Sequence, residues 1–267
     1  MTGPVYFFGV SSSGLPPARR IALFLDFDGT LAPIRKDPAL CEISPETRRL
    51  LQSLAKSKNQ KSGRLFIMVL SGRALDDVSS RVGIRNICYG GNHGLAIKGR
   101  GLKFVHPDAA SALPAIEEAA FRLERETAGF EGAWVERKKY SLSLHYRMAD
   151  KRAVPRLRRI FDGVAAGFSM DKDKKLLATA TGKKVLELKP ASWDKGQAVL
   201  WVLGRLKGEY LPVFAGDDET DETAFRALKD TGVTVRLGRS KSTLANFYLK
   251  GRWEVCRLLE AVLAWPD

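Results

Sequence analysis

Cysteine and histidine are scarce in this chain of 267 residues, which contains three of each. Cys41, Cys88 and Cys256 are widely spaced, odd in number and part of no metal-binding motif. The sequence therefore argues against a disulfide framework and against a zinc site. A protein without disulfides fits a reducing compartment, so we expect it in the cytoplasm.

The chain also lacks an apolar run of the length needed to cross a bilayer, which is about 20 residues. The run at residues 5–10 is too short for the core of a secretory signal, and no basic residue precedes it. Ser, Gly and Pro are frequent at residues 11–17, so we expect the segment before Arg19 to be a loosely held, irregular leader. We expect no membrane association and a monomeric protein.

Acidic side chains are in deficit: 30 Asp and Glu stand against 44 Lys and Arg, which gives a net charge of +14. Such an excess favours anionic ligands, among them nucleic acid, a membrane surface or a phosphorylated metabolite. The basic residues are scattered, and no aromatic-and-basic recognition motif accompanies them. We therefore expect a small phosphorylated substrate and no nucleic-acid partner.

The stretch Ile21–Leu31 is the feature around which the chain is organised. Its apolar run ends abruptly in Asp26, Asp28, Gly29 and Thr30. An apolar run of this length predicts a strand buried on both faces, as at the centre of a parallel sheet. Ligands of an open α/β sheet bind at the carboxyl ends of its strands, so the pattern indicates chemistry at this point. The alternative is a simple turn, because Asp and Gly are the commonest turn residues.

Asp26 and Asp28 are residue types suited to phosphoryl transfer. Asp26 can attack phosphorus and form an acyl phosphate, which water then hydrolyses. Asp28 can protonate the leaving oxygen and then activate the water, provided that the chain turns at Gly29. Two adjacent carboxylates repel a phosphate, and a hard cation, Mg²⁺, would remove that repulsion.

Polar residues also follow other predicted strands. Ser71 can donate a hydrogen bond to a phosphoryl oxygen or, alternatively, only cap the next helix. Lys195, just ahead of a helix predicted at 198–206, can aim its ammonium at the acidic cluster. The strand at 211–215 leads into acids that would repel one another without a bound cation, and Asp217 is the natural direct ligand. The strands and their polar residues are Leu65–Leu70 with Ser71 and Arg73, Ile87–Tyr89 with Asn92 and His93, and Leu211–Ala215 with Asp217, Asp218 and Asp221.

Between residues 108 and 188 the pattern changes to helices and alternating strands. Apolar spacing predicts helices near 116–123 and 154–164. Alternation at 140–147 and a hairpin at 176–188 predict a small antiparallel sheet. We expect two helices on one side of this sheet and an open polar face on the other, which either grips a polyol or is only a solvated surface. The polar residues of that face are His145, Arg147, Lys183 and Glu187.

The predicted fold is therefore α/β. A Rossmann-like core with a parallel sheet occupies residues 1–107 and 189–267, and a smaller α+β domain, 108–188, is inserted into it.

The order of these motifs resembles that of the haloacid dehalogenase superfamily of Mg²⁺-dependent phosphohydrolases, and the insert resembles the superfamily's C2-type cap. Within it, the chain is similar to the trehalose-6-phosphate phosphatase family over nearly everything after the leader. One position departs from the family pattern, because Arg137 stands where we expect an acid. The motifs that carry the resemblance are Leu25–Leu31, Ser71–Arg73, Asn92–Gly94, Glu136–Lys138, Ser141–Arg147, Gly182–Lys183 with Glu187, Lys195, and Gly216–Phe225.

The resemblance implies a role for each matching residue. Asp26 would be the nucleophile and Asp28 the acid and base, while Ser71 and Lys195 would bind phosphate. Mg²⁺ would be held by Asp26, the Asp28 carbonyl and Asp217, with Asp218 and Asp221 as direct or water-mediated ligands. The candidates for binding the disaccharide are Lys138, Ser141, His145, Arg147, Lys183 and Glu187, with Arg73, Asn92 and His93 near the mouth of the site.

The implied activity is hydrolysis of trehalose 6-phosphate to trehalose and phosphate through an aspartyl-phosphate intermediate, a step of trehalose biosynthesis. Other enzymes with the same core and a related cap are alternatives, namely phosphatases for sucrose 6-phosphate, glucosylglycerol phosphate or mannosyl-3-phosphoglycerate, and phosphomannomutases. An alternative of another class is a basic nucleic-acid-binding protein with a degenerate phosphatase core.

Overall fold

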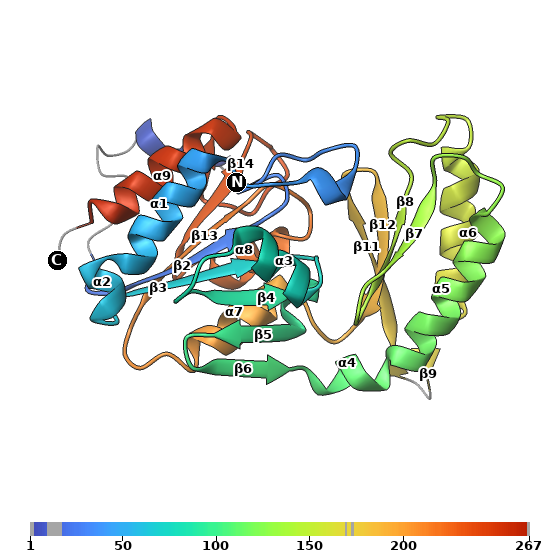
Figure 1. Cartoon of the computed structure of the whole chain (residues 1–267), viewed down its shortest axis with the longest axis horizontal. Helices are drawn as coiled ribbons and strands as arrows, with labels where there is room; N and C mark the ends of the chain where they lie inside the picture. The colour runs from blue at the N-terminus through green and yellow to red at the C-terminus, as the bar shows by residue number, and fades with distance from the viewer. Residues whose placement is uncertain (1–2, 10–17, 169, 172–173, 266–267) are drawn as a thin grey trace. The chain divides into compact units, whose positions relative to one another are not determined.

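The computed structural model describes residues 3–9, 18–168, 170–171 and 174–265. Within them the chain forms two compact units (Figure 1). The larger unit comprises Met1–Lys103 and Lys195–Asp267, and the smaller unit comprises Phe104–Asp194. The domain boundaries expected from the sequence, after residues 107 and 188, fall inside a helix, α4 (Pro107–Ser111), and a strand, β12 (Val185–Pro190).

The larger unit is built on a sheet with β2 near its centre. In spatial order, the strands β1, β15, β14, β13, β2, β3 and β4 each pair in parallel with the next. Strand β5 then pairs antiparallel with β4. Every residue of β2 and β3 is buried, as the unbroken apolar runs predict. In spatial order the strands are β1 (Val5–Tyr6), β15 (Phe247–Leu249), β14 (Val233–Leu237), β13 (Leu211–Gly216), β2 (Ile21–Asp26), β3 (Leu65–Leu70), β4 (Cys88–Gly91), β5 (Ala96–Gly99) and β6 (Leu102–Val105).

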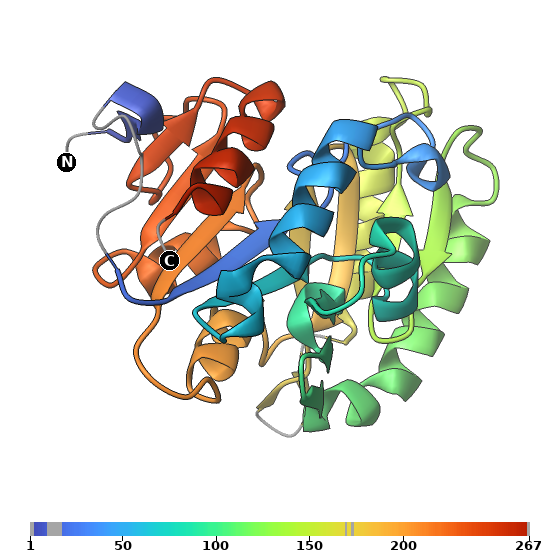
Figure 2. The same cartoon turned by 60° about the vertical axis from the view of Figure 1, so that its left-hand side comes forward.

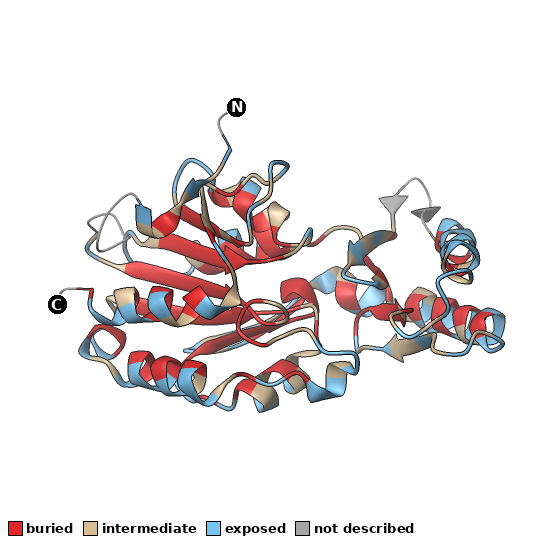
Figure 3. Ribbon diagram, turned by 90° about the horizontal axis from the view of Figure 1, so that it is seen from above, coloured by how far each residue is buried: buried red, intermediate tan, exposed pale blue. Residues whose placement is uncertain are grey.

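Helices cover both faces of this sheet. Leu23 and Leu25 share a hydrophobic cluster with residues of α1 (Pro45–Lys56), α3 (Leu75–Val82) and α9 (Val255–Leu263). On the opposite face, Phe214 of β13 meets Phe225 of α8 (Glu222–Leu228) edge to face, and α8 packs against α7 (Lys195–Leu203). Figure 3 shows the buried strands beside helices whose outward sides are exposed.

Helix α1 illustrates how the local sequence sets these elements. Ser44 caps it, with its Oγ accepting a hydrogen bond from the Thr47 amide at 3.1 Å, and Pro45 occupies the first helical position. Leu50, Leu51 and Leu54 then recur on one side and are buried, each contributing about 1.5–3 kcal/mol of transfer free energy. A short helix, α2 (Lys58–Lys61), comes next, and 3₁₀ turns lie at Phe7–Gly9, Pro38–Leu40, Asn92–Gly94 and Arg252–Glu254.

The prediction of a loosely held leader is wrong for residues 5–9. Strand β1 extends the sheet by pairing in parallel with β15, next to the C-terminal strands in Figure 2. Phe7 is 1% exposed because it packs into the same cluster as β14 and α9. The apolar content of this segment therefore outweighs the neighbouring Ser, Gly and Pro, and residues 10–17 lie outside the described part of the chain.

The smaller unit is an antiparallel sheet with α5 (Leu113–Thr127) and α6 (Val154–Ala166) on one face (Figure 1). The predicted alternation is confirmed, since Leu142, Leu144 and Tyr146 all pack into the core shared with these helices. The α/β fold class expected from the sequence is therefore confirmed, with an extended parallel sheet and a separate small antiparallel one. The strand order is β11 (Leu177–Gly182), β12, β8 (Leu142–His145) and β7 (Trp134–Arg137), and β9 (Met170–Asp171) pairs with β10 (Lys174–Lys175).

Two exclusions drawn from the sequence can be compared with the structure. No helix in the described part of the chain is both long enough and apolar enough to cross a membrane. Cys41, Cys88 and Cys256 are all free thiols. Burial raises the pKa of the Cys88 thiol to about 12, so this thiol is inert packing at neutral pH. The cytoplasmic location and the monomeric state stay predictions.

Candidate active site

The carboxyl ends of neighbouring parallel strands bring the predicted catalytic residues together. Asp26 is the last residue of β2, Asp217 follows β13 directly, and Ser71 follows β3 directly. Because β13 and β3 both pair in parallel with β2, these three residues share one edge of the sheet. This edge is where open α/β sheets bind ligands.

Lys195 and the buried acids form one charge cluster at this edge. Oxygens of Asp26, Asp217 and Asp221 lie within 4.8 Å of one another, and all three side chains are buried. Lys195 Nζ donates to Asp26 Oδ1 and to Asp221 Oδ1, each at 2.7 Å. Helix α7 begins at Lys195, so the predicted start at residue 198 is wrong and the lysine occupies the first helical position. That position fixes its backbone while its side chain reaches the acids.

Asp221 anchors the cluster. Its Oδ1 accepts from Lys195, and its Oδ2 accepts from the backbone amides of Asp217 at 2.9 Å and Asp218 at 3.1 Å. Gly216 lets this carboxylate approach, since a Cβ at that position would lie 2.3 Å from the Asp221 carboxyl carbon. With its oxygens engaged in this way, Asp221 holds both the lysine and the loop that carries Asp217.

The electrostatics of the cluster show an excess of negative charge. Burial raises the pKa of the Asp26 carboxyl well above its usual value; Lys195 lowers this pKa, and Asp221 and Asp217 raise it further. Burial also raises the pKa of Asp221. The Lys195 ammonium loses hydration through burial, yet Asp221 and Asp26 raise its pKa well above 10.5, so it stays charged. The Lys195 ammonium does not balance the charge of all these carboxylates, so a further positive charge at this position would be favourable.

The donor set fits Mg²⁺, which prefers a few carboxylate oxygens and completes its shell with water and phosphate. Asp26 Oδ2 is buried and has no hydrogen-bond partner among the residues that the structure describes, as expected of an atom reserved for a ligand. At Gly29, which has a φ of +91°, a Cβ would lie 2.2 Å from Asp217 Oδ2. The turn that places Asp28 therefore requires glycine both for its backbone and for the approach of Asp217.

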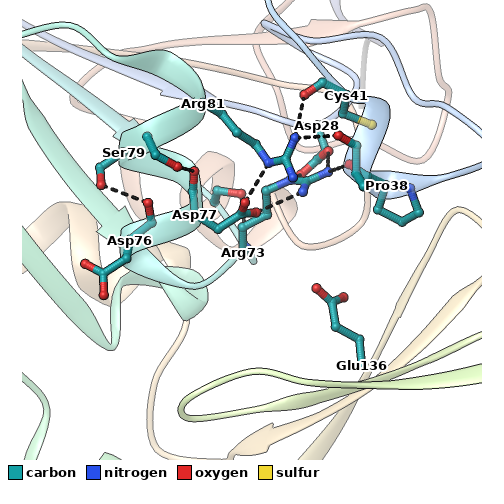
Figure 4. Close-up of polar contacts among 12 residues, drawn as sticks. Asp28, Pro38, Cys41, Arg73, Asp76, Asp77, Ser79, Arg81 and Glu136 are labelled. Atoms are coloured by element: carbon teal, nitrogen blue, oxygen red, sulfur yellow. Dashed lines mark hydrogen bonds and ion pairs between the residues drawn. The ribbon is translucent and has the colours of Figure 1, made fainter.

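The Asp28 carboxylate is held by Arg73 (Figure 4). Arg73 Nε and Nη2 donate to the two oxygens of Asp28, each at 2.7 Å, and Nη1 donates to Asp77 at 2.9 Å. Arg73 Nη2 also reaches the Pro38 carbonyl. Burial disfavours the charged guanidinium, but the hydrogen bonds and charge of Asp28 and Asp77 raise its pKa. The geometry thus makes Arg73 a clamp on Asp28.

Ser71, Asn92 and His93 lie in the loops that leave β3 and β4. Ser71 Oγ accepts from the Arg73 amide at 3.1 Å, and because α3 begins at Leu75, Ser71 is not its cap. The His93 ring lies against Gly72, where a Cβ would come within 2.8 Å of it. The amides of Asn92 and His93 donate to the carbonyls of Arg73 and Ser71. These contacts hold the loop after β3 and the loop after β4 together.

The glycines ahead of Asn92 allow two backbone segments of the larger unit to approach closely. Gly90 and Gly91 belong to β4, which extends beyond the predicted strand end at Tyr89. A Cβ at Gly91 would lie 2.2 Å from the Leu75 amide nitrogen. The close backbone approach is therefore made by the start of α3. Elsewhere in the larger unit, Asp218 turns its carboxylate to its own loop, where Oδ1 accepts from Thr220 N and Oγ1 at 2.8 Å each.

His145 of β8 and Glu187 of β12 lie on the sheet face that the helices leave uncovered, whereas Arg147 and Lys183 lie in a bend and a turn beyond the strand ends. Glu187 accepts from Ser141 Oγ at 2.9 Å and from Lys138 Nζ at 3.2 Å. His145 Nε2 lies 2.8 Å from Glu136 Oε2. Arg147 donates to the Lys183 carbonyl. The structure thus groups Lys138, Ser141 and Glu187, pairs His145 with Glu136, and joins Arg147 to Lys183 at the hairpin end.

Arg137, the position that departs from the family pattern, faces the helices. It donates to Glu124 at 2.6 Å and to Glu117 at 2.5 Å, both on α5. Strand β7 therefore presents Glu136 on one face and Arg137 on the other, as the period of two requires.

Three contributing residues were missed among the candidates drawn from the sequence. Asp77 lies four residues after Arg73 on α3, and this spacing could have predicted the ion pair. Glu136 lies two residues before Lys138, so period-two counting could have placed it on the polar face. Trp134, two residues earlier, stacks on His145 across the strands at a centroid distance of 4.2 Å. Its partner depends on strand register, which the sequence pattern alone does not provide.

The fold is that of the haloacid dehalogenase superfamily, and the smaller unit corresponds to an inserted cap. A family model described as trehalose-phosphatase matches residues 24–252, so the chain belongs to the trehalose-phosphatase family.

Individual relatives agree with this assignment. The trehalose-phosphate phosphatase of Mycobacterium tuberculosis is 38% identical over 224 residues, which cover 82% of this chain and 54% of that protein. Trehalose-phosphate phosphatase B of Arabidopsis thaliana is 33% identical over 264 residues, covering 92% of this chain and 67% of that protein. The chain thus spans about half the length of the mycobacterial relative. The C-terminal domain of C. albicans trehalose-6-phosphate phosphatase has the same fold, with a TM-score of 0.77, 24% identity and 93% of each chain covered.

Proposed function

We propose that the chain is a Mg²⁺-dependent phosphohydrolase that cleaves trehalose 6-phosphate to trehalose and phosphate. Membership of the trehalose-phosphatase family supports this substrate. The observation that carries the chemistry is the Asp26 carboxylate. This carboxylate is buried at the end of the central strand β2. One of its oxygens accepts a hydrogen bond from Lys195 Nζ, and the other has no hydrogen-bond partner among the described residues.

Asp26 acts as the nucleophile in this proposal. One of its carboxylate oxygens attacks phosphorus, the bond from phosphorus to the sugar oxygen breaks, and an aspartyl phosphate forms on Asp26. Lys195, bound to Oδ1, orients the carboxylate and stabilises charge on the phosphoryl oxygens. Ser71 adds a hydroxyl donor at the neighbouring strand end.

Asp28 acts as the general acid and base. It protonates the leaving sugar oxygen and then takes a proton from the water that attacks the aspartyl phosphate. The two hydrogen bonds from Arg73 fix the position of this carboxylate. Arg73, which the sequence suggested as a substrate ligand, thereby becomes a positioning residue for the acid.

Mg²⁺ would be held by Asp26, Asp217 and the Asp28 carbonyl. The cation, when bound, neutralises the repulsion between the carboxylates and an incoming phosphate. Asp221 supports this arrangement through the amide of Asp217. Asp218, whose carboxylate accepts from Thr220, is the acidic residue outside the cluster of Asp26, Asp217 and Asp221.

The smaller unit selects the sugar in this proposal. Glu136, His145, Lys138 and Glu187 offer paired donors and acceptors to hydroxyl groups, and an ill-fitting sugar would leave some of them unpaired. Ser141, Arg147 and Lys183 extend this polar set, while Asn92 and His93 are candidates from the larger unit.

The test is phosphate release from trehalose 6-phosphate, glucose 6-phosphate and sucrose 6-phosphate, with Mg²⁺ and with a chelator. We expect strong, Mg²⁺-dependent selectivity for trehalose 6-phosphate. Preference for another sugar phosphate would retain the chemistry and overturn the substrate. Absence of turnover on all of them would overturn the proposed activity.

A further inference from the structure

The polar face of the smaller unit's sheet is ordered in rows by its register. The middle row contains Glu136, Ser143, Glu187 and Ala180, each directly opposite the next. The row at one end contains Trp134, His145, Val185 and Gly182. Two acids and one hydroxyl therefore occupy three of the four positions of the middle row, whereas the end row combines an indole, an imidazole and an apolar side chain.

Trp134 is the exceptional residue of the end row. It is 44% exposed, although a large aromatic side chain gains free energy from burial. Its ring lies 4.2 Å from the His145 ring with an interplanar angle of 9°, so the two rings are stacked face to face. This stacking fixes the plane of the imidazole.

The second contact of His145 fixes the orientation of its ring nitrogens. Nε2 lies 2.8 Å from Glu136 Oε2, so Nδ1 is the ring nitrogen that does not face Glu136. Stacking and this hydrogen bond together hold Nδ1 in a defined direction. The pair then presents a polar ring nitrogen beside an exposed indole, which suits a hydroxylated ring with an apolar C–H face.

We infer that Trp134 is a specificity-determining residue: it positions the His145–Glu136 pair and supplies a stacking surface for a pyranose ring of the substrate. This inference rests on the proposed function. Arg137, three residues further along the same strand, faces the helices, so the role belongs to the polar face of β7 and not to the strand as a whole.

The test compares Trp134→Ala, Trp134→Phe and the wild-type chain on trehalose 6-phosphate and on 4-nitrophenyl phosphate, which carries no sugar. The readout is the ratio of kcat/KM for the two substrates. We expect Trp134→Ala to lower this ratio by about 3- to 10-fold, mainly through KM, and Trp134→Phe to recover most of it. Trp253→Ala is the matched control, because Trp253 is 70% exposed and belongs to the larger unit.

A binding readout separates positioning from general structure. Trehalose should change the intrinsic fluorescence of the wild-type chain and of Trp253→Ala, and the change should be lost in Trp134→Ala. An unchanged ratio in Trp134→Ala, or an equal loss on both substrates, would overturn the inference while the proposed function stands. A wild-type chain that hydrolyses 4-nitrophenyl phosphate but not trehalose 6-phosphate would overturn both.

Discussion

The larger and the smaller unit use charged side chains under different physical conditions. In the larger unit, the buried ammonium of Lys195 lies 2.7 Å from the buried carboxylates of Asp26 and Asp221 and compensates their negative charge. In the smaller unit, Arg137 forms exposed pairs with Glu117 and Glu124, while a separate polar face carries hydrogen-bonded pairs such as Glu136 with His145. A buried charge without a partner is costly, whereas an exposed one is hydrated. Substitutions in the buried cluster of the larger unit should therefore affect chemistry, and stability too where a buried charge loses its partner, whereas those on the sheet of the smaller unit should affect selectivity or very little.

The largest expected effect is on turnover, from Asp26→Asn. The amide lacks the nucleophilic oxygen, so kcat should fall by about 10⁴-fold or more. The side chain keeps its shape, and we expect the fold to remain intact by circular dichroism and thermal unfolding. Appreciable phosphate release by the purified variant would refute the nucleophile assignment.

Lys195→Met should reduce both stability and turnover. Removal of the ammonium leaves Asp26 and Asp221 buried without their compensating charge, which costs about 3–5 kcal/mol of unfolding free energy. Urea unfolding measures this loss, and Lys207→Met is the control because Lys207 is exposed. Equal stabilities of the two variants would show that the cluster is hydrated.

Mg²⁺ should stabilise the fold more as the pH rises. The folded pKa of Asp26 lies above the usual value of 3.8, so its contribution to stability is complete below 3.8 and is lost as the pH rises through the raised pKa. Mg²⁺ binds the ionised carboxylates and offsets that loss, by about 2.7 kcal/mol at 100 times its dissociation constant.

The measurement is the thermal unfolding midpoint with Mg²⁺ and with a chelator at about pH 5 and about pH 7.5. We expect a larger Mg²⁺ effect at the higher pH in the wild-type chain and a smaller one in Asp26→Asn. A Mg²⁺ effect that is independent of pH and of Asp26 would place the cation elsewhere.

Glu187→Ala tests the expected role of the smaller unit in substrate selectivity. Its loss leaves Lys138 and Ser141 without their shared acceptor, so KM for trehalose 6-phosphate should rise by about 10-fold or more while 4-nitrophenyl phosphate is affected much less. Glu187→Gln retains one acceptor oxygen, so its KM for trehalose 6-phosphate should lie between those of the wild-type chain and Glu187→Ala. Equal losses on both substrates would make Glu187 structural.

Local pattern predicted the elements of both regions better than it predicted their contacts. The apolar runs before Asp26 and Ser71 were long enough to specify buried strands, and Ser44 with Pro45 specified the start of α1. Spacing at strand ends also brought Asp26 and Asp217 to one edge. The pairing of Arg73 with Asp28 was not predictable, because it joins side chains 45 residues apart.

The ends of elements were also less predictable than their cores. The Lys195 side chain at the start of α7 is held by distant acids, and the structure of residues 5–9 depends on pairing with β15, more than two hundred residues later. Both are tertiary effects that override local composition. Trp134 belongs to the same class, since its role depends on the register of β7 against β8.

The smallest expected effect comes from Arg137→Ala. Its pairs with Glu117 and Glu124 are exposed, so their loss should cost less than about 1 kcal/mol of unfolding free energy. Because Arg137 faces α5 while Glu136 faces away from it, the preference for trehalose 6-phosphate over 4-nitrophenyl phosphate should stay within about twofold of wild type. Urea unfolding and the two-substrate assay check both values. A marked change in selectivity would mean that the helix side of β7 controls its polar face, and the separation of roles within this strand would fail.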